Sequence, residues 1–192
     1  VIWKAPTAPG YRFTGWTGDP GCEGSEPTLT ISVSRDVACV AHYVRRWVVT
    51  GTVDDGYGEI MVSSASPFAS CARGTCEVDA NADVTLAAPA RDGYRLDAWE
   101  GDGCGDSDRA SIVVKPNADI TCRAVYVMSL TVRGSSLGVA DAAIVASSTS
   151  DNARCDQALC AIDPGAEVKL SAPEVPEFRF GGWSGDERCS ST

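Results

Sequence analysis

Cysteine is the residue type in this sequence whose number and spacing point to definite chemistry. The chain of 192 residues contains nine cysteines and a single histidine. Eight cysteines form four pairs with two recurring separations, one short and one long. The short pairs are Cys71 with Cys76 and Cys155 with Cys160, and the long pairs are Cys22 with Cys39 and Cys104 with Cys122. This recurrence predicts four disulfides and an oxidising, extracellular compartment.

Zinc binding is the alternative use of these cysteines. A zinc site needs closely spaced cysteine pairs that converge on one ion, whereas acidic loops separate these cysteines and residues 1–44 hold only two of them. We therefore expect no metal and no other cofactor. The ninth cysteine, Cys189, aligns with Cys104, and its expected partner lies beyond Thr192, so we expect it to be unpaired.

An internal repeat places the cysteines. Trp16, Trp99 and Trp183 each begin a Trp-x-Gly-Asp motif, and the two intervals between them are almost equal in length. The repeat predicts three regions: a partial unit (C-terminal half) at 1–44, a complete unit at 45–127 and a partial unit (N-terminal part) at 128–192. The sequence is accordingly expected to be a mature fragment of a longer chain, without a signal peptide.

Within each unit, apolar residues alternate with polar ones, which is the period of a β-strand. In the complete unit we expect strands near 47–53, 58–64, 75–79, 83–88, 93–99, 110–115 and 120–127, and no helix. The joints at Arg45-Arg46 and 127–129 are short and not rich in glycine or serine, so neighbouring units should be coupled semi-rigidly. The expected core residues are Leu29, Ile31, Val33, Val84, Leu86, Tyr94, Leu96, Ile112 and Tyr126.

These observations predict an all-β fold: tandem, small, disulfide-stapled β-sandwich-like units arranged as an elongated rod. A unit as short as 45–127 is only marginally stable on its own because of its surface-to-volume ratio, and cross-links add stability.

Three further features have both a functional and a structural interpretation. Trp16, Trp99 and Trp183 are either exposed platforms for a sugar, and so a surface-binding site, or plugs at the end of a sandwich, and we favour plugs because every unit carries the residue. Three acidic residues of one loop either bind Ca²⁺ or are solvated turn residues, and we favour the second interpretation for Asp102, Asp106 and Asp108. His42 is expected at a surface or strand edge. With no nucleophile elbow and no second histidine, the sequence predicts that the chain is not an enzyme.

The composition limits the partners. Lysine and arginine number 16 and aspartate and glutamate 26, so the net charge is −10. Such a chain repels phosphate, so we expect no nucleic-acid binding. No run approaches the roughly 18 apolar residues of a membrane span, so we expect no membrane insertion. The expected partners are neighbouring repeats of the same longer chain, with self-association into filaments or a cell-surface or glycan ligand as further possibilities.

The repeat resembles the divergent internalin-type B-repeat family, also called the bacterial repeat domain. Trp-x-Gly-Asp with flanking cysteines and the closing aromatics Tyr43 and Tyr126 carry the resemblance. The third unit departs from the pattern, with Glu177 in place of the glycine before the aromatic and an insertion-prone loop at 147–152 before the cysteine pair. The resemblance implies a bacterial cell-surface or secreted protein, adhesins among them, and a non-catalytic module.

The function we expect is that of a stalk, spacer or filament segment of a bacterial surface protein. The alternatives are a carbohydrate- or protein-binding module and an accessory repeat of a secreted hydrolase. An exposed aromatic platform would distinguish the first of these alternatives.

Overall fold

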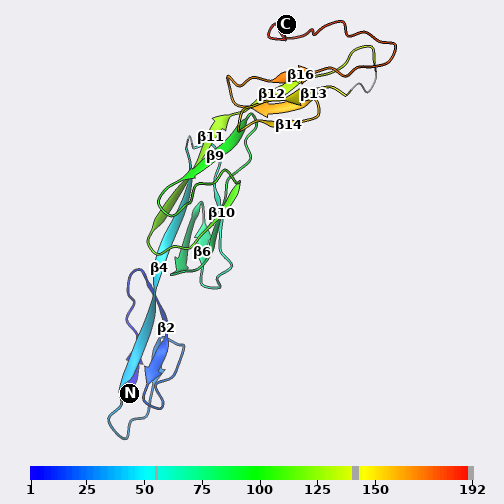
Figure 1. Cartoon of the computed structure of the whole chain (residues 1–192). Coiled ribbons are helices and arrows are strands. Elements are labelled where there is room, and N and C mark those ends of the chain that lie inside the picture. Colours follow the sequence, from blue (N-terminus) through cyan, green and yellow to red (C-terminus); the bar gives the residue numbers. More distant parts are fainter. Residues whose placement is uncertain (55, 140–142, 190–192) are drawn as a thin grey trace. The chain divides into compact units, whose positions relative to one another are not determined.

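The fold is all-β, as the alternating pattern predicts. The computed structural model describes residues 1–54, 56–139 and 143–189, and these residues form sixteen strands and no helix (Figure 1). The chain divides into two compact units. The first unit contains residues 1–90 and 96–126, and the second contains residues 91–95 and those from 127 onward.

The complete repeat contains two sheets. One has the strand order β6-β7-β4-β11-β9 and the other the order β10-β8-β5. β4 is antiparallel to β7 but parallel to β11, with Val49 opposite Ile120. The strands are β4 (Cys39–Val53), β5 (Met61–Ser63), β6 (Ser70–Ala72), β7 (Thr75–Asp79), β8 (Val84–Ala87), β9 (Tyr94–Glu100), β10 (Ser111–Val114) and β11 (Ile120–Met128).

Residues from both sheets form one core. Its buried side chains are Val49, Ile60, Cys76, Val78, Val84, Leu86, Trp99, Cys104, Ile112, Val114, Ile120, Cys122 and Ala124. The predictions for Val84, Leu86 and Ile112 are therefore confirmed. Leu96 and Tyr126 are partly buried against this core, and Tyr94 is half-buried.

The first partial repeat has a small core of its own. β1 (Ile2–Lys4) pairs with β3 (Thr28–Thr30), and β2 (Tyr11–Gly18) pairs with the first part of β4. Leu29 and Ile31 are buried as predicted. The prediction for Val33 is wrong, since this side chain is 45% exposed. β3 ends at Thr30, so the alternation no longer places Val33 on a sheet face.

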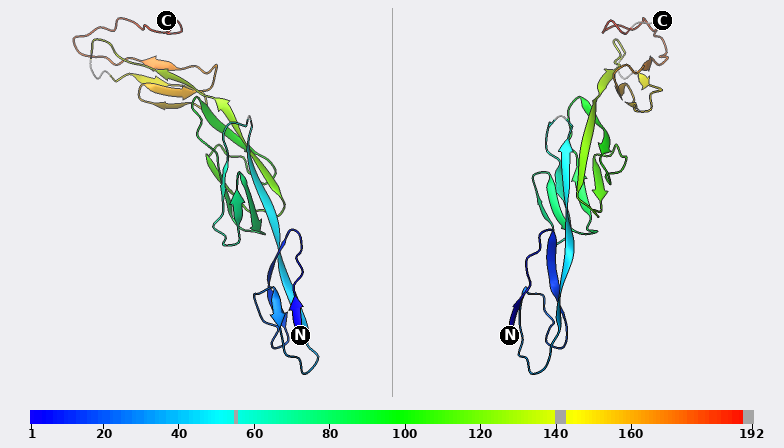
Figure 2. Two further views of the ribbon diagram at one scale, coloured as in Figure 1. Left: turned by 180° about the vertical axis from the view of Figure 1, so that it is seen from behind. Right: turned by 90° about the vertical axis from the view of Figure 1, so that its left-hand side faces the viewer.

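One strand crosses the boundary between the first two repeats. β4 has fifteen residues, where the sequence predicted two strands, one closing the first unit and the next starting near residue 47, joined without a flexible linker. Its pairing partner changes at the predicted joint: Arg45 is opposite Tyr11 of β2, and Arg46 is opposite Asp79 of β7. Figure 2 shows β2 along one part of β4 and the sheet of the complete repeat along the other. The joint is thus a continuous strand rather than a linker.

The third partial repeat repeats the pairing of the complete one. β12-β15-β14 corresponds to β4-β7-β6, and β13-β16 corresponds to β5-β8. Its small core contains Ala146, Cys160 and Ile162. The strands are β12 (Leu130–Arg133), β13 (Val145–Ser147), β14 (Arg154–Asp156), β15 (Leu159–Ile162) and β16 (Lys169–Ser171).

Candidate functional site

The four predicted disulfides are present, and they are of two structural kinds. In the first kind, here called the long-loop disulfide, a cysteine of the loop after Trp-x-Gly-Asp joins the strand that closes the repeat. Cys104 joins Cys122 of β11 with 5.6 Å between their Cα atoms, and Cys22 joins Cys39 with 5.4 Å. Cys104 and Cys122 are both buried, so this bond lies inside the core of the complete repeat.

A glycine allows the loop to reach that strand. Gly101, the glycine of the second Trp-x-Gly-Asp, has φ 128°, and an added Cβ atom would collide with the backbone carbonyl of Thr121. Gly18 has φ 137°, and a Cβ atom added there would collide with the backbone carbonyl of Ala38. Only glycine fits such an approach. The motif therefore brings the loop against the neighbouring strand, where the long-loop disulfide forms.

The second kind, the hairpin disulfide, staples a two-stranded turn. Cys71 of β6 is opposite Cys76 of β7, and Cys155 of β14 is opposite Cys160 of β15. Both short cysteine pairs therefore lie across antiparallel hairpins. Cysteines in a disulfide carry no thiolate for zinc, so the zinc alternative is wrong for these eight residues. Cys189 is free and exposed.

The tryptophans of the first two repeats are plugs, not platforms. Trp99 is 1% exposed and Trp16 is 8% exposed. The ring nitrogen of Trp99 donates a hydrogen bond to the carbonyl of Arg109 at 2.9 Å, and that of Trp16 to the carbonyl of Glu26 at 3.0 Å. Burial of the ring and use of its N–H leave neither ring a free face for a sugar, which corrects the surface-binding prediction for both. Trp183 is half-buried and contacts the ring of Phe180.

The closing aromatics also have a structural role. The hydroxyl of Tyr43 donates to the carbonyl of Pro6 at 2.7 Å, and the hydroxyl of Tyr126 donates to the carbonyl of Pro89 at 2.5 Å. Each bond ties the closing strand to the proline that precedes the Gly-aromatic-Arg turn. The partial burial of Tyr126 follows from this polar anchor, since its hydroxyl needs a partner.

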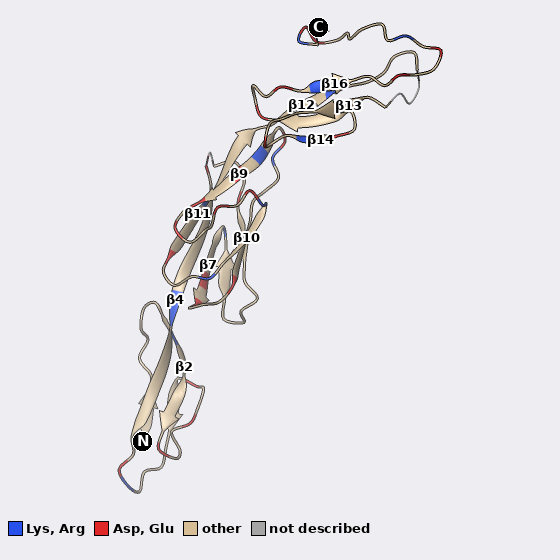
Figure 3. Ribbon diagram, in the orientation of Figure 1, with Lys and Arg blue, Asp and Glu red and all other residues tan. Residues whose placement is uncertain are grey.

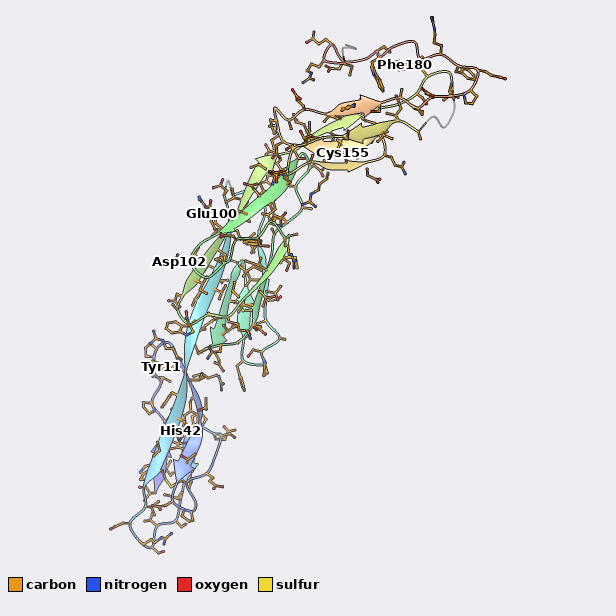
Figure 4. All side chains as sticks on the ribbon, viewed as in Figure 1. Tyr11, His42, Glu100, Asp102, Cys155 and Phe180 are labelled. Atoms are coloured by element: carbon orange, nitrogen blue, oxygen red, sulfur yellow. A yellow bond between two sulfur atoms is a disulfide. The ribbon has the colours of Figure 1, made fainter. Side chains whose placement is uncertain are left out.

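The remaining predicted residues lie on the surface. Asp102, Asp106 and Asp108 are not buried, and acidic residues occur in many segments of the described chain, where the ribbon is red in Figure 3. His42 lies on β4, with its Nε2 atom 2.6 Å from the hydroxyl of Thr17, and Figure 4 shows it well away from Asp102. Across the described ranges, no three His, Cys, Asp or Glu side chains are grouped so that they could hold a metal ion. None of the described residues forms a helix that could span a membrane.

The fold and these contacts define a class of protein: a β-repeat protein in which a repeat is closed by disulfides, a buried tryptophan and a tyrosine anchor. The sequence pattern of the divergent InlB B-repeat domain matches residues 1–46 and 69–129, more than half of the chain. The chain therefore belongs to the divergent InlB B-repeat family. A search of curated proteins found no match.

Proposed function

We propose that this chain is a non-catalytic structural segment, a stalk or spacer, of a bacterial cell-surface or secreted protein. The observation that carries the proposal is the single strand β4, which serves two successive repeats without a linker. A strand of fifteen residues spans about 50 Å. A shared strand makes successive repeats continue along one line and resists bending at the joint.

The location in the proposal rests on chemistry and on the family. Four disulfides persist in oxidising compartments. The match to the InlB B-repeat domain supports a bacterial surface or secreted location, which the resemblance implies, and the net charge of −10 favours a soluble chain. The partners of such a segment are neighbouring repeats of the same protein, and lateral association into filaments is a further expectation.

Small-angle scattering tests the stalk. A compact chain of 192 residues has a radius of gyration of about 16 Å. We expect a value well above this and a distance distribution with a long tail. A globular profile, with the radius of gyration of a compact chain, would overturn the stalk proposal. A reduced sample is the control, since loss of the disulfides should change the profile towards that of an unfolded chain.

A second candidate function, a carbohydrate- or protein-binding module, is favoured only by the third repeat. There Phe178 is 60% and Phe180 53% exposed, and both line a groove with Trp183. Titration of the tryptophan fluorescence with bacterial and host polysaccharides tests this module, with Trp183→Ala as the variant that should abolish any response. The accessory repeat of a secreted hydrolase remains the third proposal, and the stalk geometry serves it equally.

A further inference from the structure

An arginine–aspartate pair lies at the joint between the first and second repeats. Arg12, on β2 of the first repeat, faces Asp79 at the end of β7 in the second. The Arg12 Nε atom lies 3.1 Å from both carboxylate oxygens of Asp79, and a second guanidinium nitrogen also donates to this carboxylate. The exposed fractions of the two side chains are 26% and 14%. The pair is therefore bidentate and largely shielded from solvent.

The same pair occurs one repeat later. Arg95 holds the place of Arg12 in the next Gly-Tyr-Arg turn, and Asp163 holds the place of Asp79 at the end of the next stapled hairpin. Two nitrogens of Arg95 each donate to Asp163 at 2.8 Å, and the exposed fractions are 19% and 27%. These bonds lower the pKa of Asp163 to about 2, and a weaker contribution comes from the Asn152 amide. Residues 91–95, although part of the second repeat by sequence, belong to the compact unit of the third.

Backbone hydrogen bonds accompany each pair. The amide of Arg46 donates to the carbonyl of Gly10, and the amide of Ser129 donates to the carbonyl of Gly93, both at 2.8 Å. Gly10 and Gly93 precede the aromatic residue of the same Gly-Tyr-Arg turn. Thus each turn is held to the next repeat by its backbone and, two residues later, by its arginine.

The surroundings of the two pairs differ, whereas the pairs do not. At the first joint Arg12 also stacks on Phe68, 3.6 Å from the ring centroid, and Arg46 contacts Asp79. At the second joint Asn152 takes the place of Phe68 and donates to Asp163 at 3.0 Å, and Ser129 takes the place of Arg46. The arginine–aspartate pair is the part of the side-chain contact common to both joints. An incidental surface ion pair would not be expected to recur at equivalent positions with bidentate geometry both times.

We infer that the Gly-Tyr-Arg turn of one repeat is a docking surface for the front half of the following repeat. The arginine of this turn recognises the aspartate that ends the stapled hairpin of the following repeat. We call this contact the joint clamp. The occupant is thus a repeat whose hairpin ends in Cys-x-x-Asp, as at Cys76–Asp79 and Cys160–Asp163. The inference rests on the proposed stalk function, because it names the contact that sets the order and stiffness of the repeats.

Hydrogen exchange of single amides in the full chain tests the clamp. In Arg12→Gln we expect the amide of Arg46 to exchange about tenfold faster or more, since a charged hydrogen-bonded pair is lost. The amide of Ser129 should be unchanged. In Arg95→Gln the pattern should reverse, with Ser129 faster and Arg46 unchanged. Amides of the paired strands β8 and β10 should exchange at the wild-type rate in both variants.

Two further variants complete the design. Arg179 holds the same place in the third repeat, is exposed, and makes no hydrogen bond or ion pair with the described residues, so Arg179→Gln should leave both joints unchanged. The charge exchange Arg95→Asp with Asp163→Arg should restore the slow exchange of Ser129. Unchanged exchange at the joints in both arginine variants, or equal acceleration at the joints and in β8 and β10, would overturn the clamp. The scattering of the wild-type chain tests the stalk separately, so either proposal can fail alone.

Discussion

The buried tryptophan of the complete repeat gives the sharpest test of the plug interpretation. Trp99 is 1% exposed, lies in the core with Leu86 and Cys122, and uses its N–H on the carbonyl of Arg109. Truncation of a buried tryptophan to alanine costs about 3–5 kcal/mol. A domain as small as the complete repeat has a free energy of unfolding of about 4–12 kcal/mol. Trp99→Ala should therefore remove about a quarter or more of the free energy of unfolding of this repeat.

Trp99→Phe separates packing from hydrogen bonding. It keeps an aromatic ring but leaves the carbonyl of Arg109 without its donor, which costs about 1–3 kcal/mol. The assay is urea unfolding followed by circular dichroism, with Trp183→Ala as the matched control at the same repeat position. Because Trp183 is only half-buried, its truncation should cost about 1 kcal/mol or less. Equal midpoint shifts for Trp99→Ala and Trp183→Ala would refute the plug.

Three further predictions concern the staples, a turn and acid. Removal of the long-loop disulfide of the complete repeat should destabilise the repeat by about 1 kcal/mol more than removal of its hairpin disulfide, because the longer loop restricts the unfolded chain more. Urea unfolding of two variants, each with both cysteines of one disulfide changed to alanine, measures this difference. Glu177 has φ 69°, and the equivalent residues Gly10 and Gly93 have φ 73° and 74°. Glu177→Gly should therefore raise the melting temperature of the third repeat, because it relieves about 1 kcal/mol of backbone strain. Gly93→Glu should introduce the same strain and lower the melting temperature of the joint region. The pKa of Asp163 is lowered from 3.8 to about 2, so its contribution to stability is present above pH 4 and is lost as the pH falls from about 4 to about 2. An NMR titration of the carboxyl carbon should show this low midpoint, and Arg95→Gln should move it up towards the ordinary value; a midpoint unchanged by that substitution would assign the shift to another cause.

The sequence predicts the strands of the complete repeat because their alternation is strong. Val84 and Leu86 are two residues apart, and both are buried on one face of β8. The disulfides follow from recurrence, since a spacing that appears twice constrains the pairing more than any single spacing. The prediction that Val33 is buried fails because the alternation continues past the end of β3, and periodicity alone does not show where strand pairing stops.

The long extent of β4 and the joint clamp were not predicted, for two different reasons. The boundary at Arg45-Arg46 is visible in the repeat, but only pairing geometry shows that one strand crosses it. The clamp joins residues 67 and 68 positions apart, which local patterns do not connect. A signal was nevertheless present, since the arginine of Gly-Tyr-Arg and the aspartate of Cys-x-x-Asp both recur with the repeat.

The half-repeat, rather than the repeat, is the smallest stapled element of this chain. The hairpin disulfide lies in the front half and the long-loop disulfide in the back half, so each half carries one cross-link. Residues 1–44 correspond to a back half only, yet they bury Trp16, Leu29 and Ile31 around Cys22. A small core with one cross-link can persist where a core alone is marginal. Under the proposed function, a force along the chain would act on the shared strand and the joint clamp, while each disulfide keeps its own loop or hairpin closed.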